Sequence, residues 1–267
     1  MSFLTGKAAQ PIITPERIDK NRYRAPLFFG AIAVAAAMFS IPMFLTGSTT
    51  TALAMIYLAI FIVSYAVAAW CLKYFLSAGR TYWSHASHQV VMTTPTGMLL
   101  FEVGVPLLGV LGVPLAAVAW LLHRQGDWIG SAALAALGAL SLPYLLQAFQ
   151  GFQPVRHRIT ISKSGIALIQ ANGRSHEIPW KEHPHLIGVH QADAVIVLKN
   201  HRETRYPIGY LPLSMRQLER LLSTFSSDGR LRARLSGPEA LSTVLAVLEP
   251  TEEERTDGSW TWSRRSR

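Results

Sequence analysis

The segment RITISKSGIALIQANGRSHEIPW, Arg158–Trp180, decides the class of the polar half of this chain. Apolar and polar residues alternate in three short runs, residues 158–162, 166–171 and 174–180, and a period of two is typical of half-buried β-strands. An Asn-Gly pair separates the last two runs, which is the strongest short signal for a β-hairpin. The segment therefore predicts three short antiparallel strands.

The residues that follow continue this pattern and then change period. Residues 185–189, 194–199 and 204–209 read as three further strands separated by polar turns. Ser214 is a suitable N-cap, and after it apolar residues recur at helical spacing. They are Met215, Leu218, Leu221, Leu222 and Phe225. Such a helix can cover the open end of a strongly bent sheet. We expect residues 156–235 to form a small antiparallel β-barrel or sandwich with a C-terminal capping helix.

This arrangement resembles the pleckstrin-homology (PH)-like domains that follow membrane spans in bacterial proteins. The resemblance is carried by ITISKSGIALIQANGRSHEIPWKEH, AVIVLKN, RYPIG and the helix LSMRQLERLL, within residues 156–227. It implies a binding or regulatory module and names no ligand. Eukaryotic PH domains that hold phosphoinositides use a Lys in the first turn and an Arg-x-Arg on the second strand. Lys163 occupies the first turn here but no Arg-x-Arg follows, so the resemblance does not imply inositide binding in that mode.

The chain before this segment is predominantly apolar. Half of all residues are hydrophobic and only 15% are charged, which is typical of membrane proteins. Four runs, residues 25–45, 51–72, 97–122 and 128–149, reach the ~20 apolar residues that cross a bilayer. Small residues in the first and fourth runs, among them Gly30, Gly130 and Gly138, favour close helix contacts. The expected fold class is an α+β membrane protein with a four-helix transmembrane domain over residues 25–150.

Loop charges predict the orientation of these spans. Basic residues gather in the N-terminal segment, residues 1–24, in the second connection and after the fourth span, whereas the first connection is uncharged. The positive-inside rule then places both termini in the cytoplasm, as expected for a multi-pass protein of the plasma membrane. Trp70, Tyr74, Tyr82 and Trp83 are expected to form an aromatic belt on that side. A cleaved signal peptide is the less favoured alternative, because a second apolar run follows the first at once.

Composition also limits the partners. The net charge of +9 suits an anionic membrane surface, while no nucleic-acid-binding motif is present. Cys71 is the single cysteine, which excludes an internal disulfide. The lipid bilayer is therefore one partner, a protein or anionic lipid headgroups another, and a homo-oligomer is left open.

Glu102 is the one acidic residue inside an expected span. An intramembrane carboxylate raises the hypothesis of a proton or ion pathway. It stands close to the start of the third run, which is longer than the hydrocarbon layer requires, so an interfacial carboxylate is the simpler interpretation. A transporter or channel subunit with Glu102 in its pathway remains the alternative function.

Histidines are dense between residues 173 and 190, and a metal-dependent enzyme is the second alternative. These histidines are His176, His183, His185 and His190. A zinc site needs three or four converging ligands, but these are spread over two expected strands and two turns. His85 and His88 are expected to lie in a loop. No catalytic motif is present, so we expect no catalysis, no metal and no cofactor.

The final region, residues 236–267, is expected to hold a short helix and a disordered tail that begins at Glu249. We therefore expect a membrane-anchored, PH-like binding or regulatory module that contacts a partner protein or the anionic membrane surface. Lys163, Arg174 and Lys181 are the candidate contact residues, because all three fall in or beside turns.

Overall fold

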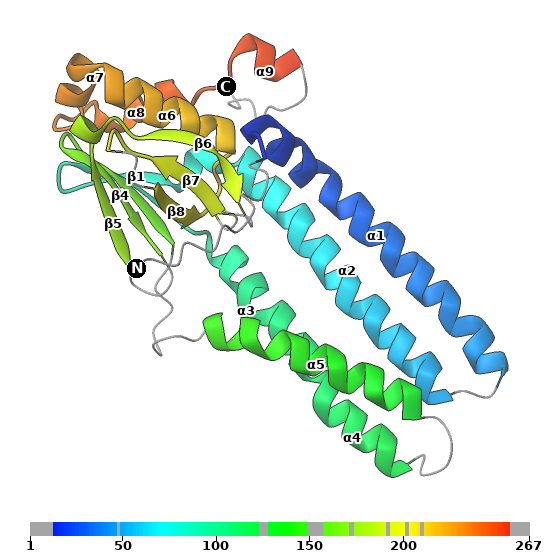
Figure 1. Ribbon diagram of the computed structural model, residues 1–267. Helices are drawn as coiled ribbons and strands as arrows, with labels where there is room; N and C mark the ends of the chain where they lie inside the picture. The colour runs from blue at the N-terminus through cyan, green and yellow to red at the C-terminus, as the bar shows by residue number, and fades with distance from the viewer. Residues whose placement is uncertain are drawn as a thin grey trace, which may run out of the picture.

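The computed structural model describes residues 13–46, 49–122, 128–148, 157–170, 174–190, 193–200, 203–208 and 211–256. It consists of a bundle of long helices and a β domain that lies at one end of this bundle (Figure 1). The connections between the two parts are short at every point that the structure describes. The domain is therefore held close to the ends of the helices.

The helices of the bundle are α1 (Pro15–Leu45), α2 (Thr49–Ser77), α3 (Thr96–Val110), α4 (Gly112–Leu122) and α5 (Trp128–Ala148). Four segments in them are long and apolar enough to cross a membrane. Their large side chains point outward, and Leu27 and Leu100 are 78% and 71% exposed. Water would oppose such exposure, whereas lipid chains do not. The four expected spans are confirmed as helices of this kind, compatible with a multi-pass membrane protein.

The third expected span is divided at Leu111 into α3 and α4. Pro114 has no N–H, so the carbonyl of Val110, four residues earlier, lacks its helical donor. The hydroxyl of Tyr57 on α2 donates to the carbonyl of Leu108, close to the break. A neighbouring helix thus supplies a donor near an interrupted helical ladder, as membrane proteins commonly do.

Glycines bring α5 close to its neighbours. A Cβ on Gly112 would lie 2.6 Å from the carbonyl oxygen of Leu134, and a Cβ on Gly138 would lie 2.9 Å from the backbone nitrogen of Val113. A Cβ on Gly130 would meet the α2 backbone equally closely. The expected small-residue packing is therefore present for Gly130 and Gly138. It does not extend to Gly30, where no described atom lies within 4 Å of the added carbon.

The strands form two antiparallel sheets. The first contains β1 (Trp83–Ala86), β2 (Gln89–Thr93), β3 (Arg158–Ile161), β4 (Gly165–Ile169) and β5 (Ser175–Pro179), in that order. The second contains β6 (His185–His190), β7 (Asp193–Val197) and β8 (Glu203–Pro207). All six expected strands are present as β3 to β8. The described strands form separate sheets, and their pairing includes no closure into a barrel.

The β1–β2 hairpin differs from what the sequence predicts for residues 83–93. Residues 83–93 lie between α2 and α3 in the sequence, yet β2 pairs with β3, with Val90 opposite Ile161. Val90 and Met92 are fully buried, and Trp83 is 4% exposed. The expected loop around His85 and His88 is therefore a hairpin, and Trp83 belongs to the core and not to an aromatic belt. Residues 25–150 thus contain two strands of the first sheet. The apolar alternation in β2 is too short to identify a strand beside two long apolar runs.

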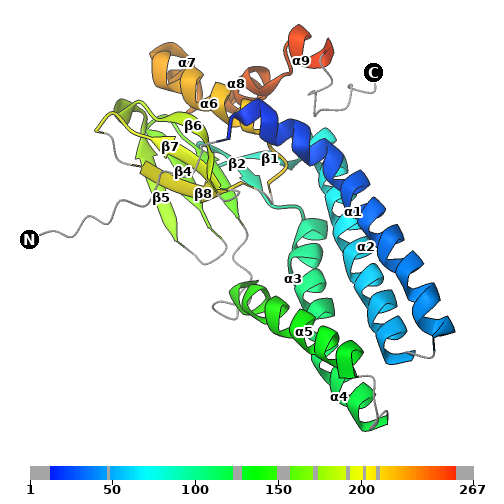
Figure 2. The same cartoon turned by 45° about the vertical axis from the view of Figure 1, so that its right-hand side comes forward.

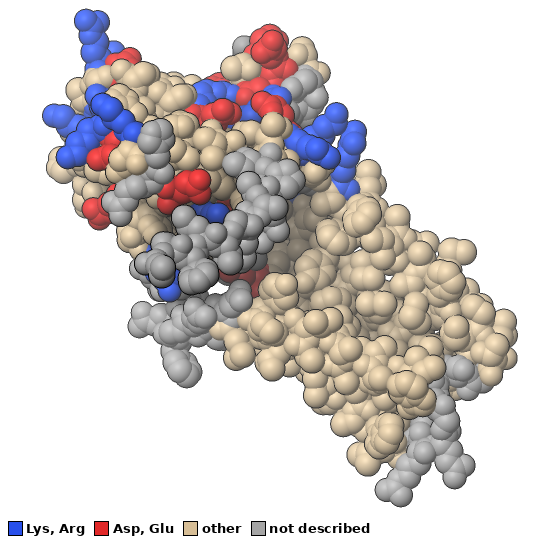
Figure 3. Space-filling model, viewed as in Figure 1, with Lys and Arg blue, Asp and Glu red and all other residues tan. Residues whose placement is uncertain are grey.

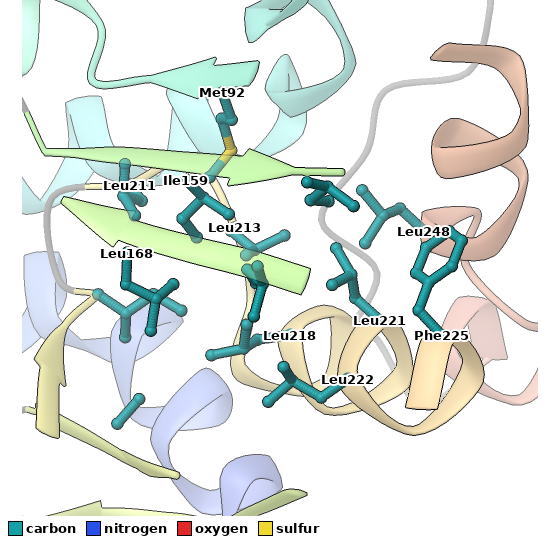
Figure 4. Close-up of a cluster of buried hydrophobic side chains, with 14 of the residues drawn as sticks. Met92, Ile159, Leu168, Leu211, Leu213, Leu218, Leu221, Leu222, Phe225 and Leu248 are labelled. Carbon is teal, nitrogen blue, oxygen red and sulfur yellow. The ribbon is translucent and has the colours of Figure 1, made fainter. Parts of the chain in front are cut away.

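Helix α6 (Met215–Ser227) covers the sheets, as its apolar stripe predicts. Its N-terminus carries a capping box, in which Ser214 accepts from the backbone N–H of Gln217 and the Gln217 side chain accepts from that of Ser214. Figure 4 shows Met92, Ile159 and Leu168 from the sheet packed with Leu218 and Leu222 of α6. Burial of these side chains joins β2, which precedes α3 in the sequence, and β3 and β4, which follow α5, into one core.

The C-terminal region is more ordered than expected. Helices α7 (Gly229–Arg234), α8 (Ala240–Leu248) and α9 (Glu252–Thr256) follow α6, and Leu248 is fully buried in the core. Glu254 of α9 forms an ion pair with Arg220 of α6, and Glu249 forms one with Arg80 after α2. The expected tail from Glu249 is therefore folded as far as Thr256, because acidic side chains find basic partners on α6 and beyond α2. Residues 257–267 lie outside the described residues.

Candidate functional site at the membrane–domain junction

Two central strands of the five-stranded sheet connect to membrane helices. β2 ends at Thr93 and α3 begins at Thr96, while β3 follows α5 in the chain. Figure 2 shows α3 extending from the lower side of the β domain into the bundle. Thr93 lies opposite Arg158 in the paired strands. Only Thr94 and Pro95 thus separate β2 from α3.

His157 lies at this junction, immediately before β3. His157 is 4% exposed, and its Nε2 lies 3.8 Å from Oε1 of Glu102 on α3. The carbonyl oxygen of His157 accepts hydrogen bonds from the backbone N–H and the hydroxyl of Thr94, at 3.1 and 3.0 Å. The base of β3 and the start of α3 are therefore held together by two hydrogen bonds and by a contact that becomes an ion pair when the imidazole is protonated.

The domain side of the junction is formed by β7 and β8. The ring of Tyr206 lies edge-on to that of His157, with 6.2 Å between ring centroids, and its hydroxyl is within donating distance of the carbonyls of Arg158 and Ile169. Burial raises the pKa of Tyr206, so the hydroxyl stays protonated as a donor. Burial also raises the pKa of Asp193, although Arg205, His157 and His190 act in the opposite direction.

A second junction joins α1 to α6. The carboxylate of Asp19 accepts the backbone N–H of Met215 at 3.0 Å and that of Arg216 at 3.2 Å, and Asp19 is 2% exposed. These are the first two amides of α6, which have no partner within their own helix. Asp19 therefore caps α6 from a residue 196 positions away in the sequence. Beside it, Ile13 and Val189 exchange two backbone hydrogen bonds at the edge of β6.

The three basic residues expected to form a contact surface are not at one place. Lys163 lies in the β3–β4 turn, and Lys181 lies just after β5, where the N–H of Trp180 donates to the carbonyl of Ser164. Both are exposed at the end of the sheet opposite to the one that joins α3. Arg174 is exposed at the other end of the β4–β5 pair, next to Ser175 opposite Ile169. Lys163 and Lys181 thus belong together, and Arg174 lies on the membrane side.

The described residues offer no arrangement for metal chemistry. Among them, no group of three or more His, Cys, Asp or Glu side chains is placed to hold a metal ion. His183 adopts a left-handed backbone conformation, with φ 46°, at the break before β6, and His88 contacts the carbonyl of Ser236 at 3.2 Å. His88 and His183 therefore lie in turns, His185 and His190 at the two ends of β6, and His176 within β5.

No protein-family model, curated protein or solved structure matches this chain.

Sequence reasoning singled out Glu102 but missed the residues that contact the junction from the domain. His157 lies outside every strand pattern, and nothing local marks it as the partner of Glu102. Asp19 carried a weak signal, since it and Glu16 are the two acids in an otherwise basic segment of residues 1–24. An acid in such a basic segment is a weak indication that its carboxylate is buried and has a specific partner.

Proposed function

We propose that this protein is a non-catalytic, membrane-anchored binding module of PH-like type. In this proposal the helices cross a bacterial plasma membrane four times, both termini are cytoplasmic, and the β domain binds an acidic surface of a partner protein. The observation that carries the proposal is the position of Lys163 and Lys181, exposed at the end of the domain that points away from α3. One end of the domain adjoins α3, so the opposite end, with Lys163 and Lys181, is accessible to a partner.

The junction supports a regulatory element in this function. β2 and β3 are adjacent, and they connect to α3 and α5. A partner that displaces the sheet would act on both helices, and a change in the bundle would reach the sheet by the same route. The Glu102–His157 contact lies on that route. Its position between α3 and the domain favours a coupling role for Glu102 over a place in a transport pathway.

The test uses full-length protein, because the segment 156–235 lacks the β1–β2 hairpin that pairs with β3 and the helix α8 that completes the core. The wild type and the variant Lys163→Glu/Lys181→Glu are extracted from native membranes in mild detergent, and the co-purifying proteins are quantified. Like charges placed across an interface cost several kcal/mol, so recovery of the partner is expected to fall at least tenfold.

The matched control is Arg158→Glu/Arg174→Glu, which reverses two exposed charges at the membrane side of the same strands. It is expected to retain the partner. Equal losses in both double variants would show that recovery depends on net charge and not on the far end of the domain. If neither the wild type nor the control recovers a protein that the Lys163→Glu/Lys181→Glu variant lacks, the proposal is wrong.

A further inference from the structure

The part of α1 that extends beyond its membrane span has two distinct faces. Asp19 is 2% exposed and bonded to α6, and Ile18 packs against the domain core. Arg17, Lys20 and Arg24 are exposed. At ~100° per residue these three cations fall within ~60° of one another, on the side opposite Asp19. Because Asp19 is fixed on α6, the helix cannot rotate this basic face toward the domain.

The neighbouring end of α2 can be placed at the same depth. The rings of Phe29 and Tyr65 pack with centroids 5.7 Å apart, which sets the register of the antiparallel helices α1 and α2. Counting five residues outward along each helix puts Arg24 at the level of Trp70, and nine residues put Lys20 at the level of Tyr74. Trp70 and Tyr74 are 64% and 63% exposed. Lys73, also exposed, lies between these two levels.

Arg24 and Lys20 lie at the depth of the headgroup layer, and Arg17 lies just beyond its outer edge. The apolar span of α1 begins at Arg24. With a rise of 1.5 Å per residue, Lys20 lies ~6 Å and Arg17 ~10 Å beyond that point, whereas the headgroup region adds roughly 5–8 Å to each side of the hydrocarbon core. Trp and Tyr prefer this layer. Figure 3 shows basic side chains, in blue, where the bundle meets the domain, and a tan surface without Lys, Arg, Asp or Glu on the visible part of the bundle below.

The charges around this face leave it positive. Glu16, exposed and one residue before Arg17, is the nearby acid on α1. On α6, burial raises the pKa of Glu219; Glu16 and Asp19 add to the effect, and Arg216 acts in the opposite direction. Arg80 is already paired with Glu249. Among the described residues, Arg17, Lys20 and Arg24 take part in no ion pair.

We propose that Arg17, Lys20 and Arg24 of α1 form a binding site for the phosphate-bearing headgroups of anionic phospholipids. The aromatic rings of Trp70 and Tyr74 set the depth of the site, and Asp19 sets the rotation of its basic face. The site is separate from Lys163 and Lys181, so it does not depend on the binding function proposed above.

The experiment measures lipid bound to the full-length protein in a neutral detergent by native mass spectrometry. Phosphatidylglycerol and phosphatidylcholine with the same acyl chains are the two probes. The wild type is expected to bind phosphatidylglycerol at a concentration at least tenfold lower. In Arg17→Gln/Lys20→Gln/Arg24→Gln this preference is expected to disappear, since each cation near an anionic surface contributes about fivefold to binding.

Two variants keep the result interpretable. Lys199→Gln/Arg230→Gln/Arg234→Gln removes three exposed cations at the far end of the domain, and it is expected to retain the preference. Arg17→Lys/Arg24→Lys keeps the charge and is also expected to retain it, even if the neutral triple variant proves unstable. Loss of the preference in either variant, or its survival in the neutral triple variant, overturns the proposal.

A further arm separates lipid headgroups from free phosphate. Bound phosphatidylglycerol is measured in sodium chloride and in sodium phosphate at equal ionic strength. Equal retention in both salts supports a site for headgroups at the membrane surface. Displacement by phosphate beyond the effect of chloride would identify a site for the free anion and would contradict the assignment.

Discussion

Replacement of Asp19 by Ala tests whether α1 and the β domain are joined at the N-terminus of α6. The change removes a buried carboxylate that accepts two backbone N–H groups, from Met215 and Arg216. A hydrogen bond to a charged group contributes about 1.5–3 kcal/mol, and loss of a helix cap costs about 0.5–2 kcal/mol. A combined effect of about 3 kcal/mol is expected, less than the sum because both descriptions count the same bonds.

Hydrogen exchange of the full-length protein in detergent measures this effect locally. Since 1.36 kcal/mol corresponds to a factor of ten, the amides of Met215 and Arg216 are expected to exchange about a hundredfold faster in Asp19→Ala. Asp19→Asn keeps one acceptor oxygen and loses the charge, so it is expected to show an intermediate acceleration. The strands β3 and β4 are expected to keep their protection, because their core contacts are unchanged.

The control is Glu16→Gln, which removes a negative charge from the exposed side of the same helix turn. It is expected to change exchange at the start of α6 by less than a factor of three, the usual range for surface substitutions. If Asp19→Ala leaves the two amides protected, or if Glu16→Gln exposes them equally, the carboxylate does not cap α6 and the rotation assigned to α1 is wrong.

Three further substitutions test the packing of the bundle and the C-terminal helices. Gly112→Ala places a carbon 2.6 Å from the carbonyl oxygen of Leu134, so thermal unfolding in detergent is expected to show a destabilisation of about 1–3 kcal/mol. The control Gly30→Ala, whose added carbon meets no described atom within 4 Å, is expected to leave the stability unchanged. Equal melting temperatures of the two variants would contradict the close approach of α4 and α5. Tyr57→Phe removes the donor to the α3 carbonyl near the helix break and is expected to cost about 0.6 kcal/mol, the average for such bonds in membranes; an unchanged melting temperature would mean that this bond does not support the break. Hydrogen bonds from the backbone N–H groups of the first turn of α7 hold the pKa of Asp228 below its usual 3.8. A lowered acid pKa contributes stability above the unfolded-state value that is lost as pH falls through the folded-state value, so Asp228→Ala is expected to melt earlier than the wild type at pH 7 and to converge with it as the pH falls below 3.8; a constant difference across this range would exclude the carboxylate as the cause.

The local elements of this protein were predictable because their signals lie within a few residues. Residues 158–162 and 166–171 alternate with the period of a strand, and β3 and β4 form there. Length and apolarity alone marked the four spans. The break at Leu111 was within reach, since Pro114 removes a donor whose position is set by helix geometry. The long apolar run concealed it, because hydropathy does not register the missing bond.

The junctions were not predictable in the same way. Glu102 contacts His157, Asp19 contacts the start of α6, and Arg80 contacts Glu249, all across large separations in the chain. Hydrophobic periodicity reports which face of an element is buried and carries no information about which distant element covers it. The hairpin of residues 83–93 shows this most clearly, because it pairs with β3, which follows α3, α4 and α5 in the sequence.

Periodicity and hydropathy are local properties of the chain, and from them four apolar segments and a mainly antiparallel β domain with a capping helix could be inferred. The fold alone reveals that strands from before the third span and strands from after the fourth span form one domain. It also decided that Lys163 and Lys181 lie together while Arg174 lies apart, and that α1 is held at α6 by a buried carboxylate. These relations follow from the packing of one shared core, whose free energy depends on contacts between distant segments.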